Sequence, residues 1–169
     1  MLEEGKKVKA VRESKQEDHS KTASGELAGL VGYHMRMAQV AVFQDFRERL
    51  GKFGITPTHL GVLLVVKAKH QISQIDLSRA LRIDRSALVG VIDKLESRGL
   101  IERGKPLQDR RKNALVINQA GIDLLEELWV ELMEHEAAIT SRLTEEERTT
   151  LVGLLKKIGL PKGHTGAER

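Results

Sequence analysis

Apolar residues recur at steps of three and four along most of this chain, which is the spacing of one face of an α-helix. The pattern predicts a first helix from about residue 26 to residue 50, which Gly51 is expected to end. A second helix is predicted to begin with Thr56 as its N-cap and Pro57 at its first position. Its run THLGVLLVVKA is apolar on nearly every side, so we expect this helix to be buried.

Two shorter helices are predicted next, in ISQIDLSRAL with Ser73 as N-cap and in DRSALVGVIDKLESRG with Asp84 as N-cap. Gly99 is the expected end of the second of them. One face of that helix carries an i, i+3, i+4, i+7 stripe made of Leu88, Val91, Ile92 and Leu95. The opposite face is expected to point outward and to present Arg85, Ser86, Val89, Gly90 and Lys94.

After Gly99 the spacing changes to that of a β-hairpin. Residues 100–103 are predicted to pair with residues 114–117, and Pro106 is expected to prevent a regular strand in the loop between them. The loop GKPLQDRRKN is strongly basic and contains Lys105, Arg110, Arg111 and Lys112.

The C-terminal part is predicted to form two more helices. The first covers about residues 119–141 and includes Trp129, which we expect in the core. The second begins with Thr144, which forms a capping box with Glu147. It is expected to bury Leu151, Leu154, Leu155 and Ile158.

Composition and motifs narrow the function classes. The 169 residues include no cysteine, which removes disulfides, thiolate zinc sites and cysteine-based redox sensing. No apolar run is long enough to cross a membrane, and the N-terminus lacks the apolar region of a secretory signal, so a cytoplasmic location is expected. The sequence shows no glycine-rich phosphate loop and no nucleophile elbow. The six histidines have no metal-ligand spacing, so we predict no enzyme, cofactor or metal site.

Helix, turn, helix and then a basic hairpin is the order of a winged helix-turn-helix, which predicts binding to double-stranded DNA. A single helix fits the major groove, and the small residues Ser86 and Gly90 permit close approach. Arginines on a narrow loop suit the minor groove. Asp109, next to Arg110 and close to Arg111, is interpreted as a brace that holds one guanidinium.

Most of the chain, residues 27–158, resembles the MarR family of winged-helix regulators. The similarity is strongest in IDRSALVGVIDKLESRGLIER and in DRRKNALVINQAG. The resemblance implies that Asp109 and Arg111 are the wing-tip pair, with Arg111 in the minor groove. Many members have a polar residue followed by arginine where this chain has Val89 and Gly90, so the resemblance leaves open which residue reads the bases.

The resemblance also implies a homodimer built from the first helix and the last two. The predicted organisation is therefore mainly α with a small β-hairpin wing. It comprises a disordered N-terminal arm (1–24), dimerisation helices (25–54 and 119–160) and a DNA-binding lobe (55–118). On this basis we predict a repressor that binds a palindromic operator. A helical partner-binding module and a metal-responsive regulator are the alternatives.

The family commonly binds small anions, often aromatic acids, between the dimerisation helices and the DNA-binding lobe. The predicted effector is therefore a small aromatic acid or its coenzyme A thioester. The residues expected to bind this effector are Tyr33, His34, Arg36, Gln39 and His59. A core position for His34 and an ordinary surface charge at Arg36 are the competing interpretations.

Overall fold

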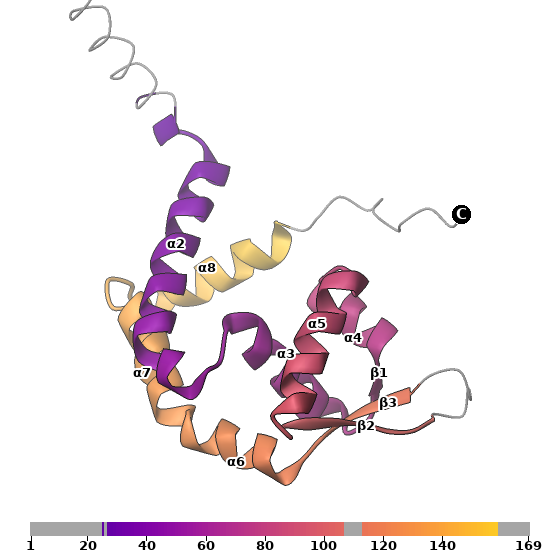
Figure 1. Ribbon diagram of the computed structural model, residues 1–169. Coiled ribbons are helices and arrows are strands. Elements are labelled where there is room, and N and C mark those ends of the chain that lie inside the picture. Colours follow the sequence, from indigo (N-terminus) through magenta and orange to yellow (C-terminus); the bar gives the residue numbers. More distant parts are fainter. Residues whose placement is uncertain (1–24, 26, 107–112, 159–169) are drawn as a thin grey trace, which may run out of the picture. The chain divides into compact units, whose positions relative to one another are not determined.

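The computed structural model describes residues 25, 27–106 and 113–158, and the predicted arm at 1–24 lies outside them (Figure 1). The chain divides into two compact units, Met1–Gln44 and Asp45–Arg169. The first contains most of the helix α2, and the second contains the remaining helices and the sheet. No helix in the described residues is both long enough and apolar enough to span a membrane.

The first long helix starts later than predicted. Residues 25, 27 and 28 are helical, the chain turns at Gly29, and α2 covers Val31–Leu50. Glycine lowers helix stability by about 1 kcal/mol relative to alanine, so Gly29 is a natural point for the interruption. The helix α2 ends at Leu50, directly before Gly51 as predicted. The short 3-10 helix η1 (Gly51–Phe53) follows, and Gly54, with φ of +64°, ends it.

The helix α3 (Pro57–Lys69) confirms the second predicted helix, with Thr56 as N-cap and Pro57 in its first turn. The backbone N–H of His59 donates to the Thr56 hydroxyl, and the Thr56 N–H donates to the imidazole Nδ1 of His59. The buried side chains of this helix form the centre of the core of the second unit: Leu60, Val62, Leu63 and Val66.

Both shorter helices are also confirmed. The helix α4 (Gln74–Leu81) has Ser73 as its N-cap, and the helix α5 (Arg85–Ser97) has Asp84 as its N-cap. Gly99 follows α5 with φ of +68°, a backbone conformation that favours glycine.

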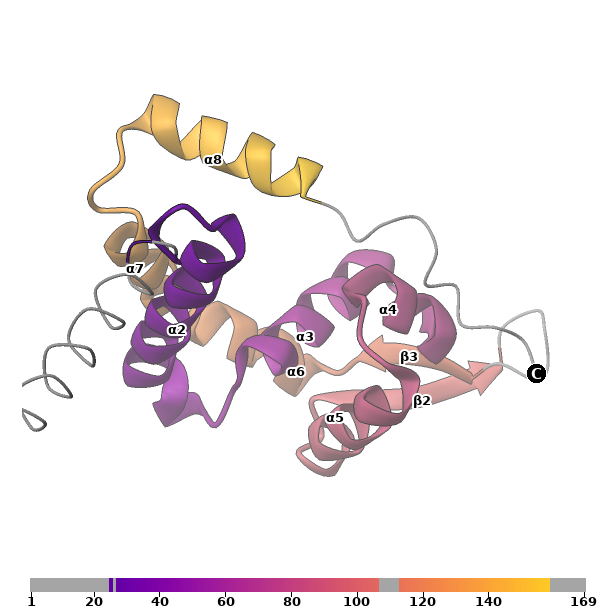
Figure 2. The ribbon, with the colours of Figure 1, turned by 90° about the horizontal axis from the view of Figure 1, so that it is seen from above.

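The sheet has three strands rather than the predicted two. The strands β1 (Ile72–Ser73), β2 (Ile101–Pro106) and β3 (Asn113–Ile117) are antiparallel and lie in the order β1-β3-β2. Figure 2 shows β2 and β3 side by side. The predicted hairpin is confirmed, with Ile101 opposite Ile117. The strand β2 extends beyond the predicted Arg103 to Pro106, but its pairing with β3 is irregular between Arg103 and Pro106, in agreement with the prediction that Pro106 prevents a regular strand there. Proline is tolerated at such irregular strand ends because no ladder bond needs its missing N–H.

The predicted helix over 119–141 is two helices, α6 (Gln119–Glu127) and α7 (Trp129–Ile139). They meet at Leu128, whose side chain is fully buried. Helical hydrogen bonds continue on both sides of this junction, from the Leu128 N–H to the Leu124 carbonyl and from the Leu132 N–H to the Leu128 carbonyl.

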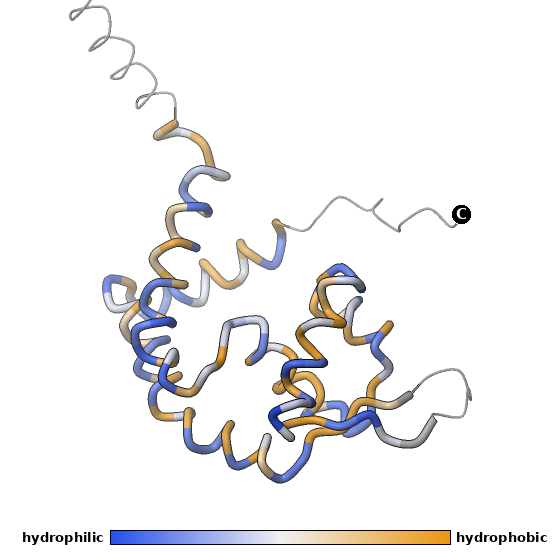
Figure 3. The backbone as a smooth tube through the Cα atoms, viewed as in Figure 1, coloured by the Kyte–Doolittle hydropathy of each residue, from blue (hydrophilic) through white to orange (hydrophobic). Residues whose placement is uncertain are grey.

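The helix α8 (Glu145–Lys157) starts at the predicted capping box of Thr144 and Glu147. The prediction that its apolar residues are buried is wrong for this single chain, because Leu151, Leu154, Leu155 and Ile158 are all exposed. Figure 3 shows these hydrophobic segments along α8. Trp129, predicted to be in the core, is 51% exposed. Helical spacing defines an apolar face but does not say what covers it.

Candidate nucleic-acid interface

The helix α5 has one face in the core and the other in solvent. Leu88, Ile92 and Leu95 are fully buried and Val91 is half-buried, as the stripe predicts. The residues predicted to face DNA are all exposed: Arg85, Ser86, Val89, Gly90 and Lys94. Nothing lies within 4 Å of the position that a Cβ atom would take at Gly90. This face can therefore approach another surface closely.

The first turn of α5 is held by Asp84. Its Oδ1 accepts hydrogen bonds from the Ser86 backbone N–H, at 2.8 Å, and from the Ser86 hydroxyl, at 2.5 Å. These bonds hold the pKa of the Asp84 carboxyl below its usual value, with the side-chain bond as the largest cause. Because the Ser86 hydroxyl proton is donated to Asp84, the Ser86 oxygen is left to accept a hydrogen bond from a partner such as a base amino group.

The strand β2 is linked to α5 by Arg103. Its guanidinium Nη2 donates to Asp93 Oδ1 at 2.5 Å, and its Nη1 donates to Glu96 Oε2. The Arg103 backbone N–H also donates to Glu96 Oε1 at 3.2 Å. The hairpin and the outward helix are therefore joined by a charged clamp as well as by the core.

The wing tip, including Asp109, Arg110, Arg111 and Lys112, lies outside the described residues. Lys105 lies on β2, whose hairpin with β3 leads to that tip. The wing-tip pair and its place in the minor groove thus stay predictions.

The residues predicted to bind the effector are divided between the two units. Tyr33, His34, Arg36 and Gln39 lie on exposed turns of α2 in the first unit. The core interpretation of His34 is wrong: the residue is exposed, with its Nε2 2.8 Å from the Ala28 carbonyl oxygen and its ring edge-on to Tyr33.

His59, the fifth residue predicted to bind the effector, lies on α3 in the second unit. Its Nδ1 accepts the hydrogen bond from the Thr56 backbone N–H that caps this helix. Burial, and then the nearby charges of Lys94 and Arg98, hold the pKa of His59 below its usual value. The juxtaposition of His59 with the α2 residues is a prediction.

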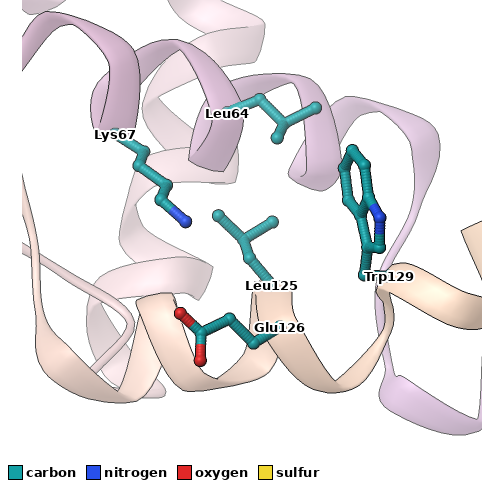
Figure 4. A pocket seen from close by; sticks show the side chains of 5 residues that line it. All are labelled: Leu64, Lys67, Leu125, Glu126 and Trp129. Atoms are coloured by element: carbon teal, nitrogen blue, oxygen red, sulfur yellow. The ribbon is translucent and has the colours of Figure 1, made fainter.

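A pocket that the sequence did not reveal lies between α3 and the junction of α6 and α7 (Figure 4). Its volume is about 380 Å³, and it is lined by Leu64, Lys67, Leu125, Glu126 and Trp129. The wall is mostly apolar, with the Lys67 ammonium and the Glu126 carboxylate at one side and the indole at the other. Among the described residues, no three histidine or acidic side chains form a group that could hold a metal ion.

Comparison with known proteins gives consistent results. The MarR family matches this chain at residues 53–112. A putative transcriptional regulatory protein for the hcr operon of Thauera aromatica is 34% identical over 142 residues, which are 83% of this chain and 86% of that protein.

Solved structures with a similar fold include two with a stated regulatory role. The transcriptional repressor CouR, bound to a 23-mer DNA duplex, has a TM-score of 0.75 at 32% identity, covering 79% of this chain and 95% of that one. Bordetella bronchiseptica BpsR, whose DNA binding is described as regulated by 6-hydroxynicotinic acid, has a TM-score of 0.71 at 26% identity, covering 78% and 96%.

Proposed function

Because this chain belongs to the MarR family of DNA-binding transcriptional regulators, we propose that it is a cytoplasmic homodimeric repressor that a small aromatic acid releases from DNA. The observation that carries the proposal is the exposed face of α5 beside the β2–β3 hairpin. A helix presented this way fits the major groove, while an adjacent wing reaches the minor groove. We propose that the exposed α5 residues and the basic wing are the DNA contacts.

The dimer is supported by apolar surface that this single chain leaves uncovered. Several large hydrophobic side chains of α7, of α8 and of the residues next to α8 are between 37% and 65% exposed: Trp129, Val130, Met133, Leu143, Leu151, Val152, Leu154, Leu155 and Ile158. Burial of apolar area is the main driving force for stable association. We expect a second copy of the chain to cover this surface and to place the two α5 helices, the proposed recognition helices, about 34–36 Å apart.

DNA binding is tested by selection of sites from a random DNA pool with the full chain. We expect a roughly palindromic site whose half-sites are about one helical turn apart, and binding that weakens steeply with salt. Selection of no sequence, or equal binding to unrelated competitor DNA, would contradict sequence-specific regulation.

The effector proposal is supported by the chemistry of the pocket between α3 and α7. An aromatic ring can stack on the Trp129 indole and contact Leu64 and Leu125, while a carboxylate can pair with the Lys67 ammonium. The relative BpsR supports this class of ligand, since its stated regulator is an aromatic acid. The exposed cluster of Tyr33, His34, Arg36 and Gln39, with His59, is the competing site for the same ligand.

Trp129 makes the effector test direct because it is the only tryptophan in the chain. We expect aromatic acids that release operator to change its fluorescence at the same concentrations. Lys67→Met should weaken the response if the pocket is the site, whereas Arg36→Ala should weaken it if the α2 cluster is the site. Release without any change in fluorescence would contradict the pocket.

A further inference from the structure

Arg98, the C-cap residue of α5, forms hydrogen bonds with residues that are far away in the sequence. Its Nη1 donates to the Gly54 carbonyl oxygen at 2.8 Å, and its Nη2 donates to the Phe53 carbonyl oxygen at 2.9 Å. These acceptors are 44 and 45 residues away in sequence and lie in the turn between α2 and α3. The end of α5 is therefore fastened to this turn by two donors of one planar group.

The turn itself is held on its other side by α7. The Lys52 ammonium lies 2.5 Å from Glu131 Oε1 and 5.2 Å from the centre of the Phe53 ring. The Gly54 backbone is in the left-handed region, so the chain reverses sharply at the residue whose carbonyl Arg98 binds. The Phe53 and Gly54 carbonyls are thus presented by a turn with defined geometry.

The last turns of α2 join the same network. The Arg49 guanidinium pairs with Asp45 at 3.1 Å on its own helix and with Glu134 of α7 at 3.0 Å. Lys52 lies three residues after Arg49, and Glu131 lies three residues before Glu134, so the two ion pairs follow one line between the elements. Through its bonds to the turn, Arg98 connects α5 to the segment that these two ion pairs hold against α7.

We propose that Arg98 is a positioning residue that fixes the orientation of α5 relative to the end of α2 and to α7, and that it thereby sets the half-site spacing the dimer accepts. The inference rests on the proposed function, because the proposed dimer contacts lie on α7 and α8 as well as on the first helix α2. In a dimer, the second lobe binds with an effective concentration that depends on how rigidly the two lobes are connected. The two Arg98 hydrogen bonds at the end of α5 act as a tether between this helix and the turn. The tether raises the effective concentration for one half-site spacing and lowers it for other spacings.

A phosphate contact by Arg98 would be the simpler explanation of a basic residue on α5, and it predicts different behaviour. A phosphate contact needs mainly charge, so lysine substitutes well for arginine. The tether needs two donors in a fixed fork to reach two carbonyl oxygens, and a lysine ammonium does not reproduce that geometry.

The experiment uses the full chain and the operator selected with the unaltered protein. Variants Arg98→Met and Arg98→Lys are compared with Arg142→Met, which removes the same charge from the exposed segment between α7 and α8. Affinity is measured for the full operator, for operators with one base pair added or removed at the centre, and for a duplex with one half-site. Thermal unfolding establishes that each variant is folded.

We expect Arg98→Met and Arg98→Lys to weaken full-operator binding about tenfold and to change half-site binding less than about twofold. The preference for the native spacing should fall from at least about tenfold to below about threefold, whereas Arg142→Met should keep it. Wild-type behaviour of Arg98→Lys, or an equal loss on half-site and full operator, would overturn the tether. Failure of the unaltered chain to select any operator would instead overturn the proposed function.

Discussion

The imidazole Nδ1 of His135 lies 2.6 Å from Oδ2 of Asp45, which is 90 residues earlier in the chain. His135 on α7 is 3% exposed and stands edge-on to the ring of Phe46. With a carboxylate as acceptor, Nδ1 carries the proton. The pair joins the end of α2 to α7 inside the second unit.

Asp45→Asn is expected to lower the free energy of unfolding by about 1–2 kcal/mol at pH 7, since a charge-assisted hydrogen bond is lost. The pKa of Asp45 is held below its usual value, first by the bond from His135 and then by Arg49. A depressed carboxyl pKa stabilises the fold above the ordinary aspartate range and stops doing so as the pH falls through the folded value.

The difference between wild type and Asp45→Asn should therefore shrink as the pH falls below about 4. Urea unfolding at pH 7, 5 and 3.5 measures it, with Asp123→Asn on the exposed face of α6 as control. A difference that stays constant over this range would contradict the assigned role of the carboxylate.

Gly121→Ala is expected to destabilise the second unit by about 3 kcal/mol. A Cβ at this position would lie 2.3 Å from the Leu100 carbonyl oxygen and 2.8 Å from the Ile117 side chain, so backbone has to move. Gly90→Ala is the matched control, because its Cβ meets nothing within 4 Å and alanine stabilises a helix interior by about 1 kcal/mol. Chemical denaturation compares the two variants, and equal stabilities would be inconsistent with the close approach at Gly121.

Arg103→Met should weaken operator binding about fivefold, which corresponds to about 1 kcal/mol, by loosening the wing from α5. The double variant Asp93→Asn, Glu96→Gln removes the same clamp from the helix side and should also weaken binding. Simple electrostatics predicts the opposite sign for the double variant, because it removes two negative charges near DNA. Titration of labelled operator distinguishes these explanations, and tighter binding by the double variant would rule out the clamp.

Leu154→Glu should convert the proposed dimer to a monomer, since a carboxylate would be buried in the proposed apolar interface. Val89→Glu places the same group on the exposed face of α5, and there we expect an intact dimer that has lost operator binding. Sedimentation velocity measures dimerisation, and operator titration measures DNA binding, so the two effects are separated. A Leu154→Glu variant that remains dimeric would place the interface elsewhere.

Arg111→Ala should weaken operator binding and reduce the salt slope by about 1 if the side chain enters the minor groove. Asp109→Ala should weaken binding as well, although it removes a negative charge, because the brace on the arginine is lost. Binding measured from low to moderate salt tests both variants. Tighter binding by Asp109→Ala would show that the carboxylate is only a repulsive charge.

Local features of this protein could be predicted from the sequence because their atoms lie within a few residues of one another. The caps at Thr56, Ser73, Asp84 and Thr144 each bond a backbone N–H two or three residues later, and all four are present. The buried stripe of α5 follows from helical geometry alone, and so does the outward direction of Val89 and Gly90. Family membership followed from the order of these elements together with the two resembling segments.

Only the tertiary structure decided features that depend on residues far apart in the chain. Ile72 and Ser73 become a strand because β3 lies beside them, and a two-residue segment has no periodicity to detect. Arg98 looks like one more basic residue of α5 until the fold brings the Phe53 and Gly54 carbonyls within 3 Å. The pocket at Trp129 exists because α3 and the α6–α7 junction meet there, and hydrophobicity along one chain does not distinguish a side chain that packs inside from one left for another molecule.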